Sequence, residues 1–275
     1  MLRSPTKLGP TDSVWAGIDA TLRLRHVPLT FRNELRSKLT GKFDGLLLYG
    51  SWARGDAGEH SDLDTLVLNL RGNRPAPEGH VSVADYDEVE LRAASGTLFG
   101  YHLVRDGLIL VERSGCLSRI LATIEPPAPG AVTERVRSLT PVLDVSTDDR
   151  EKYISGLTKV ARYLLRSALY AEALDHGEPC FSVREIAQRK NDAQLAAVLS
   201  SHELIRPAAD STVFNHLCDN LGKVVGPLLP NSYGDLHGLI EGAWADNQEL
   251  SNFATLALSD GKDELPYDEL PKVTL

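Results

Sequence analysis

The chain has 275 residues, of which 42% are hydrophobic and 24% are charged. These proportions are typical of a globular protein, and they exclude fibrous and wholly disordered classes. The net charge of −9 argues against a surface built mainly to bind a long polyanion, because such surfaces need clustered Lys and Arg to displace counterions. A small or cationic binding partner is favoured instead.

The first half of the chain predicts an alternation of helices and strands. Apolar residues at spacings of three and four predict two helices before residue 44. After them we expect strands at 45–49, 65–70 and 108–112, a loop at 71–79, and another strand that begins at His80. In this last strand Val81, Val83 and Asp85 recur at period two, so the three side chains share one face. Residues 98–107 fit either a short helix or a strand followed by a turn.

Three prolines between residues 126 and 129 indicate a linker between two domains. We expect the first domain at 1–125 and the second at 131–275. The second half has helical periodicity, which is strongest over 149–174, and it predicts an all-helical domain. The last fifteen residues are polar and interrupted by proline, and this pattern predicts an extended end.

The cysteines and the apolar segments indicate where the protein resides. Cys116, Cys180 and Cys218 have spacings that fit neither a zinc site nor an even disulfide framework, so we expect buried free thiols in a reducing compartment. No apolar run has the length of a membrane span, and the N-terminus lacks the apolar core of a secretory signal. The sequence therefore predicts a cytoplasmic protein without a membrane partner.

A Gly-Ser pair directly follows the strand predicted at 45–49. Gly50 allows the backbone to turn tightly and to approach a ligand closely, and Ser51 adds a hydroxyl and a backbone N–H at the same place. If a helix begins here, its first amides add a partial positive charge. We interpret Gly50 and Ser51 as a grip for phosphate oxygens, with Arg54 as a further residue that could steer phosphates.

Two carboxylates, Asp62 and Asp64, stand at the entrance to the strand predicted at 65–70. On an extended chain, side chains two residues apart project from one face, so the two carboxylates repel unless a cation lies between them. Mg²⁺ prefers such hard oxygen ligands and usually adds substrate phosphates and water. The combination of phosphate grip and paired carboxylates predicts metal-assisted phosphoryl or nucleotidyl transfer.

The run GSWARGDAGEHSDLD, which begins at Gly50 and ends at Asp64, resembles the signature of the nucleotidyltransferase superfamily. This superfamily includes DNA polymerase beta, the aminoglycoside nucleotidyltransferases and the minimal nucleotidyltransferases of toxin–antitoxin pairs. The resemblance covers about residues 30 to 115, and it implies an α+β domain with a mixed sheet and flanking helices, followed here by the helical domain. It also implies ATP or another NTP as co-substrate and two Mg²⁺ ions, with Mn²⁺ as a substitute.

Members of this superfamily usually supply a third carboxylate from a neighbouring strand, and it helps to bind metal and accepts a proton. We expect Asp85 in that role, with Asp87 as the alternative, although the acid often stands nearer the strand start, where this chain has Ser82. The predicted metal ligands and catalytic residues are therefore Asp62, Asp64 and Asp85.

The predicted reaction transfers a nucleoside monophosphate, most plausibly AMP, from an NTP to an acceptor hydroxyl. The size, two-domain plan and acidic charge resemble those of small-molecule nucleotidyltransferases, and this resemblance implies an acceptor such as an aminoglycoside, whose positive charge an acidic cleft would attract. Two alternatives remain open at this stage. The first is a toxin–antitoxin or phage-defence nucleotidyltransferase that modifies a protein or a tRNA, and the second is a non-catalytic binding module of the same fold.

Overall fold

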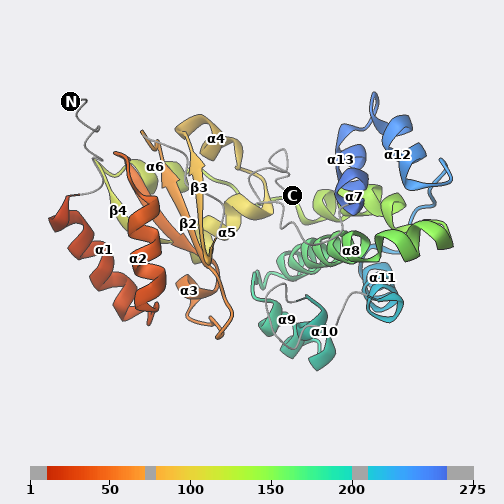
Figure 1. Cartoon of the computed structure of the whole chain (residues 1–275), viewed down its shortest axis with the longest axis horizontal. Coiled ribbons are helices and arrows are strands. Elements are labelled where there is room, and N and C mark those ends of the chain that lie inside the picture. Colours follow the sequence, from red (N-terminus) through yellow and green to blue (C-terminus); the bar gives the residue numbers. More distant parts are fainter. Residues whose placement is uncertain (1–10, 72–78, 200–209, 259–275) are drawn as a thin grey trace, which may run out of the picture. The chain divides into compact units, whose positions relative to one another are not determined.

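The computed structural model describes residues 11–71, 79–199 and 210–258. The chain divides into two compact units between Pro126 and Pro127, within the proline-rich segment (Figure 1). The first unit contains a sheet with flanking helices, and the second is built from helices. The C-terminal segment predicted to be extended lies outside the described residues.

Among the described residues, the sheet of the first unit has four strands in the order β3-β2-β1-β4. The strands are β1 (Gly45–Tyr49), β2 (Leu63–Leu68), β3 (Val81–Tyr86) and β4 (Leu108–Glu112). Strand β1 is antiparallel to both of its neighbours, whereas β2 and β3 are parallel. The α+β fold class with a mixed sheet is thus confirmed, and β2 begins two residues earlier than the sequence predicted.

Each face of the sheet is covered by its own hydrophobic cluster, because apolar residues occupy successive positions of the central strands. Leu46 and Leu48 point to one face and pack with side chains from α1 (Asp12–Leu24) and α2 (Leu29–Lys38). Leu47 points to the other face, and its cluster draws side chains from three helices on that side. These helices are α4 (Glu88–Ala93), α5 (Leu98–Asp106) and α6 (Cys116–Leu121).

Two of the short helices in this unit begin at polar caps. Asp87 is the N-cap of α4: its carboxylate accepts a hydrogen bond from the Glu90 amide at 2.8 Å, and the Glu90 side chain accepts one from the Asp87 amide at 3.0 Å. This reciprocal capping box ends β3 and begins a helix, a change that the sequence analysis did not predict. Thr97 caps α5 in a similar way, so residues 98–106 are helical.

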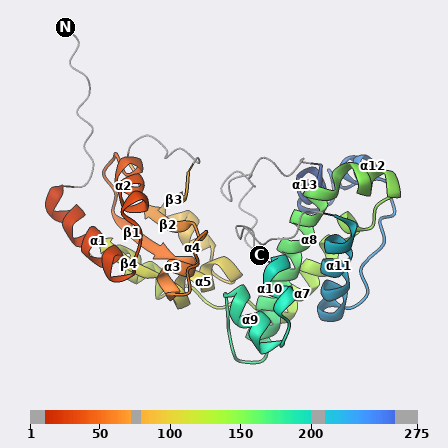
Figure 2. The same cartoon turned by 60° about the horizontal axis from the view of Figure 1, so that its bottom comes forward.

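The second unit is organised around the long helix α8 (Thr147–Asp175), which extends the predicted 149–174 helix at both ends. Its backbone departs from helical geometry at Tyr153. In Figure 2, α8 lies among the helices that pack on it. The other elements of this unit are α7 (Pro129–Leu139), the 3₁₀ turn η1 (Thr140–Leu143), α9 (Val183–Arg189), α10 (Ala193–Leu199), α11 (Ser211–Val225), α12 (Leu236–Ala243) and α13 (Gln248–Ala257).

Cys116 and Cys180 are buried free thiols, as predicted, and Cys218 is a half-buried one. Within the three described segments, every helix is too short or too polar to cross a membrane.

Candidate active site

The turn that follows β1 depends on the missing side chain of Gly50. Its φ of +73° is a left-handed conformation that other residues adopt only at a cost. A Cβ added at this position would lie 2.4 Å from Oδ2 of Asp64. Because Tyr49 pairs with Asp64 in the β1–β2 ladder, the register brings the Gly50 turn and the acidic strand to the same end of the sheet.

Ser51 belongs to α3 (Gly50–Arg54), a helix that begins at the Gly-Ser pair. With five residues, this helix is too short to provide a substantial macrodipole. Any grip on phosphate therefore depends on the local backbone amides and the Ser51 hydroxyl. Two hydrogen bonds to Ser61 close the loop between α3 and β2. Trp52 Nε1 donates to the Ser61 carbonyl at 3.2 Å, and the Gly58 amide donates to Ser61 Oγ at 2.8 Å.

Asp62 lies immediately before β2, beside a histidine that the sequence analysis did not single out. Oδ1 of Asp62 is 3.3 Å from Nδ1 of His80, and the Asp62 side chain is 25% exposed. The His80 ring in turn stacks on Phe31, with ring centroids 5.5 Å apart. Only the parallel pairing of β2 with β3 brings His80 to this place, and that pairing has no local signal in the sequence.

Asp85 does not join Asp64, because the β2–β3 register pairs Asp64 with Ser82 and pairs Asp85 with Val67. Asp85 is therefore three positions further along the ladder and, since side chains alternate, on the opposite face of the sheet. It shares the face of Val81 and Val83 as predicted, but that face packs against α1 and α2. Oδ1 of Asp85 accepts a hydrogen bond from the Leu70 amide at 3.3 Å.

The alternative third acid, Asp87, is also placed elsewhere, since its carboxylate caps α4. Ser82, whose side chain is exposed, stands opposite Asp64 in the strand where we expected an acid. Among the described residues, no group of three or more His, Cys, Asp or Glu side chains is placed to hold a metal ion.

The oxygen donors at this end of the sheet suit the Mg²⁺ that the resemblance implies. Asp62 and Asp64 provide hard carboxylate oxygens, and Gly50 leaves open the space beside Asp64 that a Cβ would fill. This donor set fits one Mg²⁺ ion, which usually takes one or two protein carboxylates together with substrate phosphates and water. A second ion would have to depend on ligands that the nucleotide or the acceptor brings.

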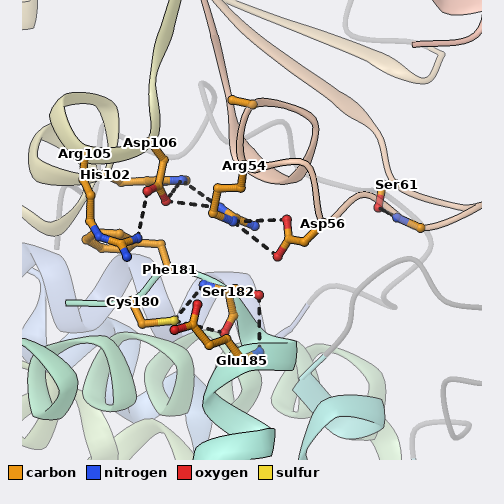
Figure 3. Close-up of polar contacts among 12 residues, drawn as sticks. Arg54, Asp56, Ser61, His102, Arg105, Asp106, Cys180, Phe181, Ser182 and Glu185 are labelled. Atoms are coloured by element: carbon orange, nitrogen blue, oxygen red, sulfur yellow. Dashed lines mark hydrogen bonds and ion pairs between the residues drawn. The ribbon is translucent and has the colours of Figure 1, made fainter. Parts of the chain in front are cut away.

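Arg54, at the end of α3, is held by two other parts of the first unit (Figure 3). Its Nε lies 3.2 Å from Oδ1 of Asp56, in the loop that follows. Its Nη1 lies 3.2 Å from Nε2 of His102 and 3.5 Å from Oδ2 of Asp106, both on α5. The Arg54 side chain is only 17% exposed, so its guanidinium is engaged inside the domain.

His102 and Asp106 have pKa values displaced by this enclosed setting. Burial, reinforced by the charges of Arg54 and Arg105, lowers the pKa of His102 to about 3. The imidazole is consequently neutral at physiological pH, and it can accept the Arg54 N–H through Nε2. Burial raises the pKa of the Asp106 carboxyl, although the neighbouring Arg105 and Arg54 act in the opposite direction.

A mixed sheet whose Gly-Ser turn abuts an acidic strand agrees with the resemblance of this region to nucleotidyltransferase domains. The model of the nucleotidyltransferase domain family matches residues 30–97, which include β1, α3, β2 and β3. Two proteins of Methanocaldococcus jannaschii, both named as candidate protein adenylyltransferases, are 47% and 45% identical to this chain over 38 residues. Those residues make up 14% of this chain, and the chain spans 38% of the length of each relative.

Gly50, the first residue of α3, and Gly55, the residue after its end, allow the role of the Gly50–Asp64 contact to be isolated. Gly50 and Gly55 have similar left-handed φ values, +73° and +85°. A Cβ on Gly50 would collide with Asp64, whereas a Cβ on Gly55 would meet nothing within 4 Å. We expect Gly50→Ala and Gly55→Ala each to lose about 1–2 kcal/mol of unfolding free energy from backbone strain. Only Gly50→Ala should also lose Mg²⁺-dependent nucleotide binding, at least tenfold by calorimetry. Equal binding losses in both variants would contradict this role for the contact.

The low pKa of His102 predicts a specific dependence of stability on pH. Below pH 6.5 the unfolded chain binds a proton at His102 that the folded protein does not bind until pH approaches about 3. Stability from this group is therefore complete above pH 6.5 and decreases as pH falls, by up to about 1.4 kcal/mol per pH unit.

The measurement is the urea midpoint of wild type and His102→Gln between pH 7.5 and 5. The decline toward low pH should be shallower in the variant, because glutamine does not titrate. The raised pKa of Asp106 acts with the opposite sign, but it is present in both proteins. Parallel profiles would show that His102 titrates normally in the folded state.

Proposed function

We propose that this protein is an adenylyltransferase that transfers AMP from ATP to an acceptor hydroxyl. The observation that carries the proposal is the contact between the Gly50 turn and Asp64, formed within the region that matches the nucleotidyltransferase family. The names of the two archaeal relatives favour adenylyl among the possible nucleotidyl groups.

The proposed reaction forms a bond between the acceptor oxygen and the α-phosphorus of ATP. The bond from that phosphorus to the oxygen that bridges to the β-phosphate breaks, the acceptor proton passes to solvent water, and pyrophosphate leaves. Gly50 and Ser51 hold the β- and γ-phosphates with backbone amides and a hydroxyl. Asp62 and Asp64 would hold the metal, which would neutralise charge that develops on the phosphates.

We favour a protein hydroxyl as the acceptor, because both relatives carry names of candidate protein adenylyltransferases. A cationic small molecule, such as an aminoglycoside, is the second candidate. The net charge of −9 supports it, since an acidic protein attracts cationic substrates.

The acceptor is identified by incubating the full chain with Mg²⁺ and ATP labelled at the α-phosphate. Separate reactions contain a soluble protein mixture, a panel of aminoglycosides, and total tRNA. In the protein mixture we expect the label to become attached to protein, so that protease treatment releases it. Label confined to the aminoglycosides or to tRNA would overturn the protein acceptor but keep adenylyl transfer. Absence of label everywhere, together with absence of ATP binding by calorimetry, would refute the proposed enzyme.

The two faces of the sheet provide a matched test of the acidic residues. Asp62→Asn and Asp64→Asn should each reduce transfer at least 100-fold, because each removes a metal-binding charge. Asp85→Asn makes the same chemical change on the opposite face, and we expect it to retain transfer within about threefold. All three variants should remain folded by circular dichroism. Loss of transfer in Asp85→Asn alone would refute our assignment of the metal ligands.

A further inference from the structure

The helix that carries the proposed phosphate grip cannot be stable by itself. Helix α3 has five residues, and an isolated helix of that length does not form in water. Its position must therefore come from contacts with the rest of the domain. One such contact is the hydrogen bond from Arg25 Nη1 to the Ala53 carbonyl, at 2.9 Å. Trp52 and Ala53 also pack in the hydrophobic cluster beneath α1 and α2, and Arg54 makes the contacts with α5.

Arg54 connects α3 to α5 through groups that lie on one side of α5. His102 and Asp106 are four residues apart, so they occupy neighbouring positions on one face of that helix. Arg54 Nη1 contacts both, at 3.2 and 3.5 Å. The Asp106 side chain is 5% exposed, and withdrawing the guanidinium would remove one of the two cations beside this buried carboxylate, leaving Arg105.

The surroundings of Arg54 are poorly suited to an anion ligand. Asp56 is 3.2 Å from Nε, and Asp106 lies on the other side. A triphosphate that approached this guanidinium would meet two carboxylates that already share its charge. His102 accepts an N–H without adding a further negative charge, so the three partners hold the guanidinium in place while it stays internal.

We propose that Arg54 is a positioning residue, which fastens α3 to α5 through His102 and Asp106 and thereby holds the Gly50–Ser51 turn against Asp64. This replaces the sequence-based interpretation of Arg54 as a residue that steers phosphates. The inference deepens the proposed function and rests on it, because the turn matters only if it holds a nucleotide.

The structure supplies two reporters and a matched control. The amides of Gly55 and Asp56 both donate to the Ser51 carbonyl, at 2.9 and 3.1 Å, so their hydrogen exchange reports whether α3 is formed. Arg105 is the control, since its Nη1 contacts Oδ1 of Asp106 at 2.8 Å from within α5. Arg105→Gln therefore removes a cation from Asp106 without removing a bond to α3.

The experiment compares Arg54→Gln, His102→Leu, their double variant, His102→Gln and Arg105→Gln. Exchange of the Gly55 and Asp56 amides is measured in the nucleotide-free full chain, and the dissociation constant for ATP with Mg²⁺ is measured by calorimetry. We expect Arg54→Gln and His102→Leu each to accelerate exchange and weaken ATP binding at least tenfold. The double variant should be no worse than the worse single one. His102→Gln should keep most of the wild-type exchange protection and ATP affinity, because its amide oxygen can accept the same N–H. The exchange rates and the ATP dissociation constant of Arg105→Gln should stay within twofold of the wild type.

One pattern would overturn the inference. If Arg54 binds phosphate directly, Arg54→Gln weakens ATP binding while exchange at Gly55 and Asp56 stays at the wild-type rate, and His102→Leu keeps full ATP affinity. If the proposed function is wrong, the wild type itself shows neither ATP binding nor transfer. That result differs from the expected pattern and from the pattern that contradicts the inference. The exchange measurement still decides whether Arg54 holds α3 in that case.

Discussion

The contact between Gly50 and Asp64 is the constraint on which the rest of this site depends. The antiparallel pairing of β1 with β2 sets Tyr49 opposite Asp64, so the chain must turn away directly beside a carboxylate. Only a residue without a side chain leaves room for that carboxylate and also adopts the required left-handed backbone. A slip of β2 by one residue would turn every side chain to the opposite face, and it would move Asp64 to the face that packs against α1 and α2.

A short helix placed after such a turn has to be held from outside. Arg25 and Arg54 fulfil this requirement from different directions, one by a bond to the carbonyl of Ala53 and the other through buried groups on α5. Interactions of this kind contribute little net stability compared with apolar packing, but each holds α3 at one defined distance from a neighbouring element. They therefore define one arrangement of the turn rather than increase the overall stability of the domain.

The sequence was sufficient to predict local features but not the alignment of neighbouring strands. Continuous apolar runs gave β1 and β4 correctly, and the Gly-Ser pair with the acidic strand predicted the family whose model matches residues 30–97. Asp85 was assigned to the correct face of β3, yet the faces of different strands cannot be related without their register, and the register places Asp64 opposite Ser82. Asp87 was misjudged for another reason, since a capping carboxylate and a strand carboxylate look alike until the partner Glu90 is recognised three residues later.

Ser82 affects how metal and nucleotide would bind at the end of the sheet that carries Asp62 and Asp64. Because Ser82 carries a hydroxyl where a carboxylate could stand, this end of the sheet has less negative charge. The carboxylates of Asp62 and Asp64 therefore experience less repulsion in the absence of a cation. The lower charge also weakens the attraction for a divalent cation without nucleotide. Binding of the cation then depends more heavily on the oxygens of a triphosphate. In the proposed enzyme, metal and nucleotide would thus arrive as one complex, and the concentration of nucleotide, rather than that of free metal, would determine how much of the protein is loaded.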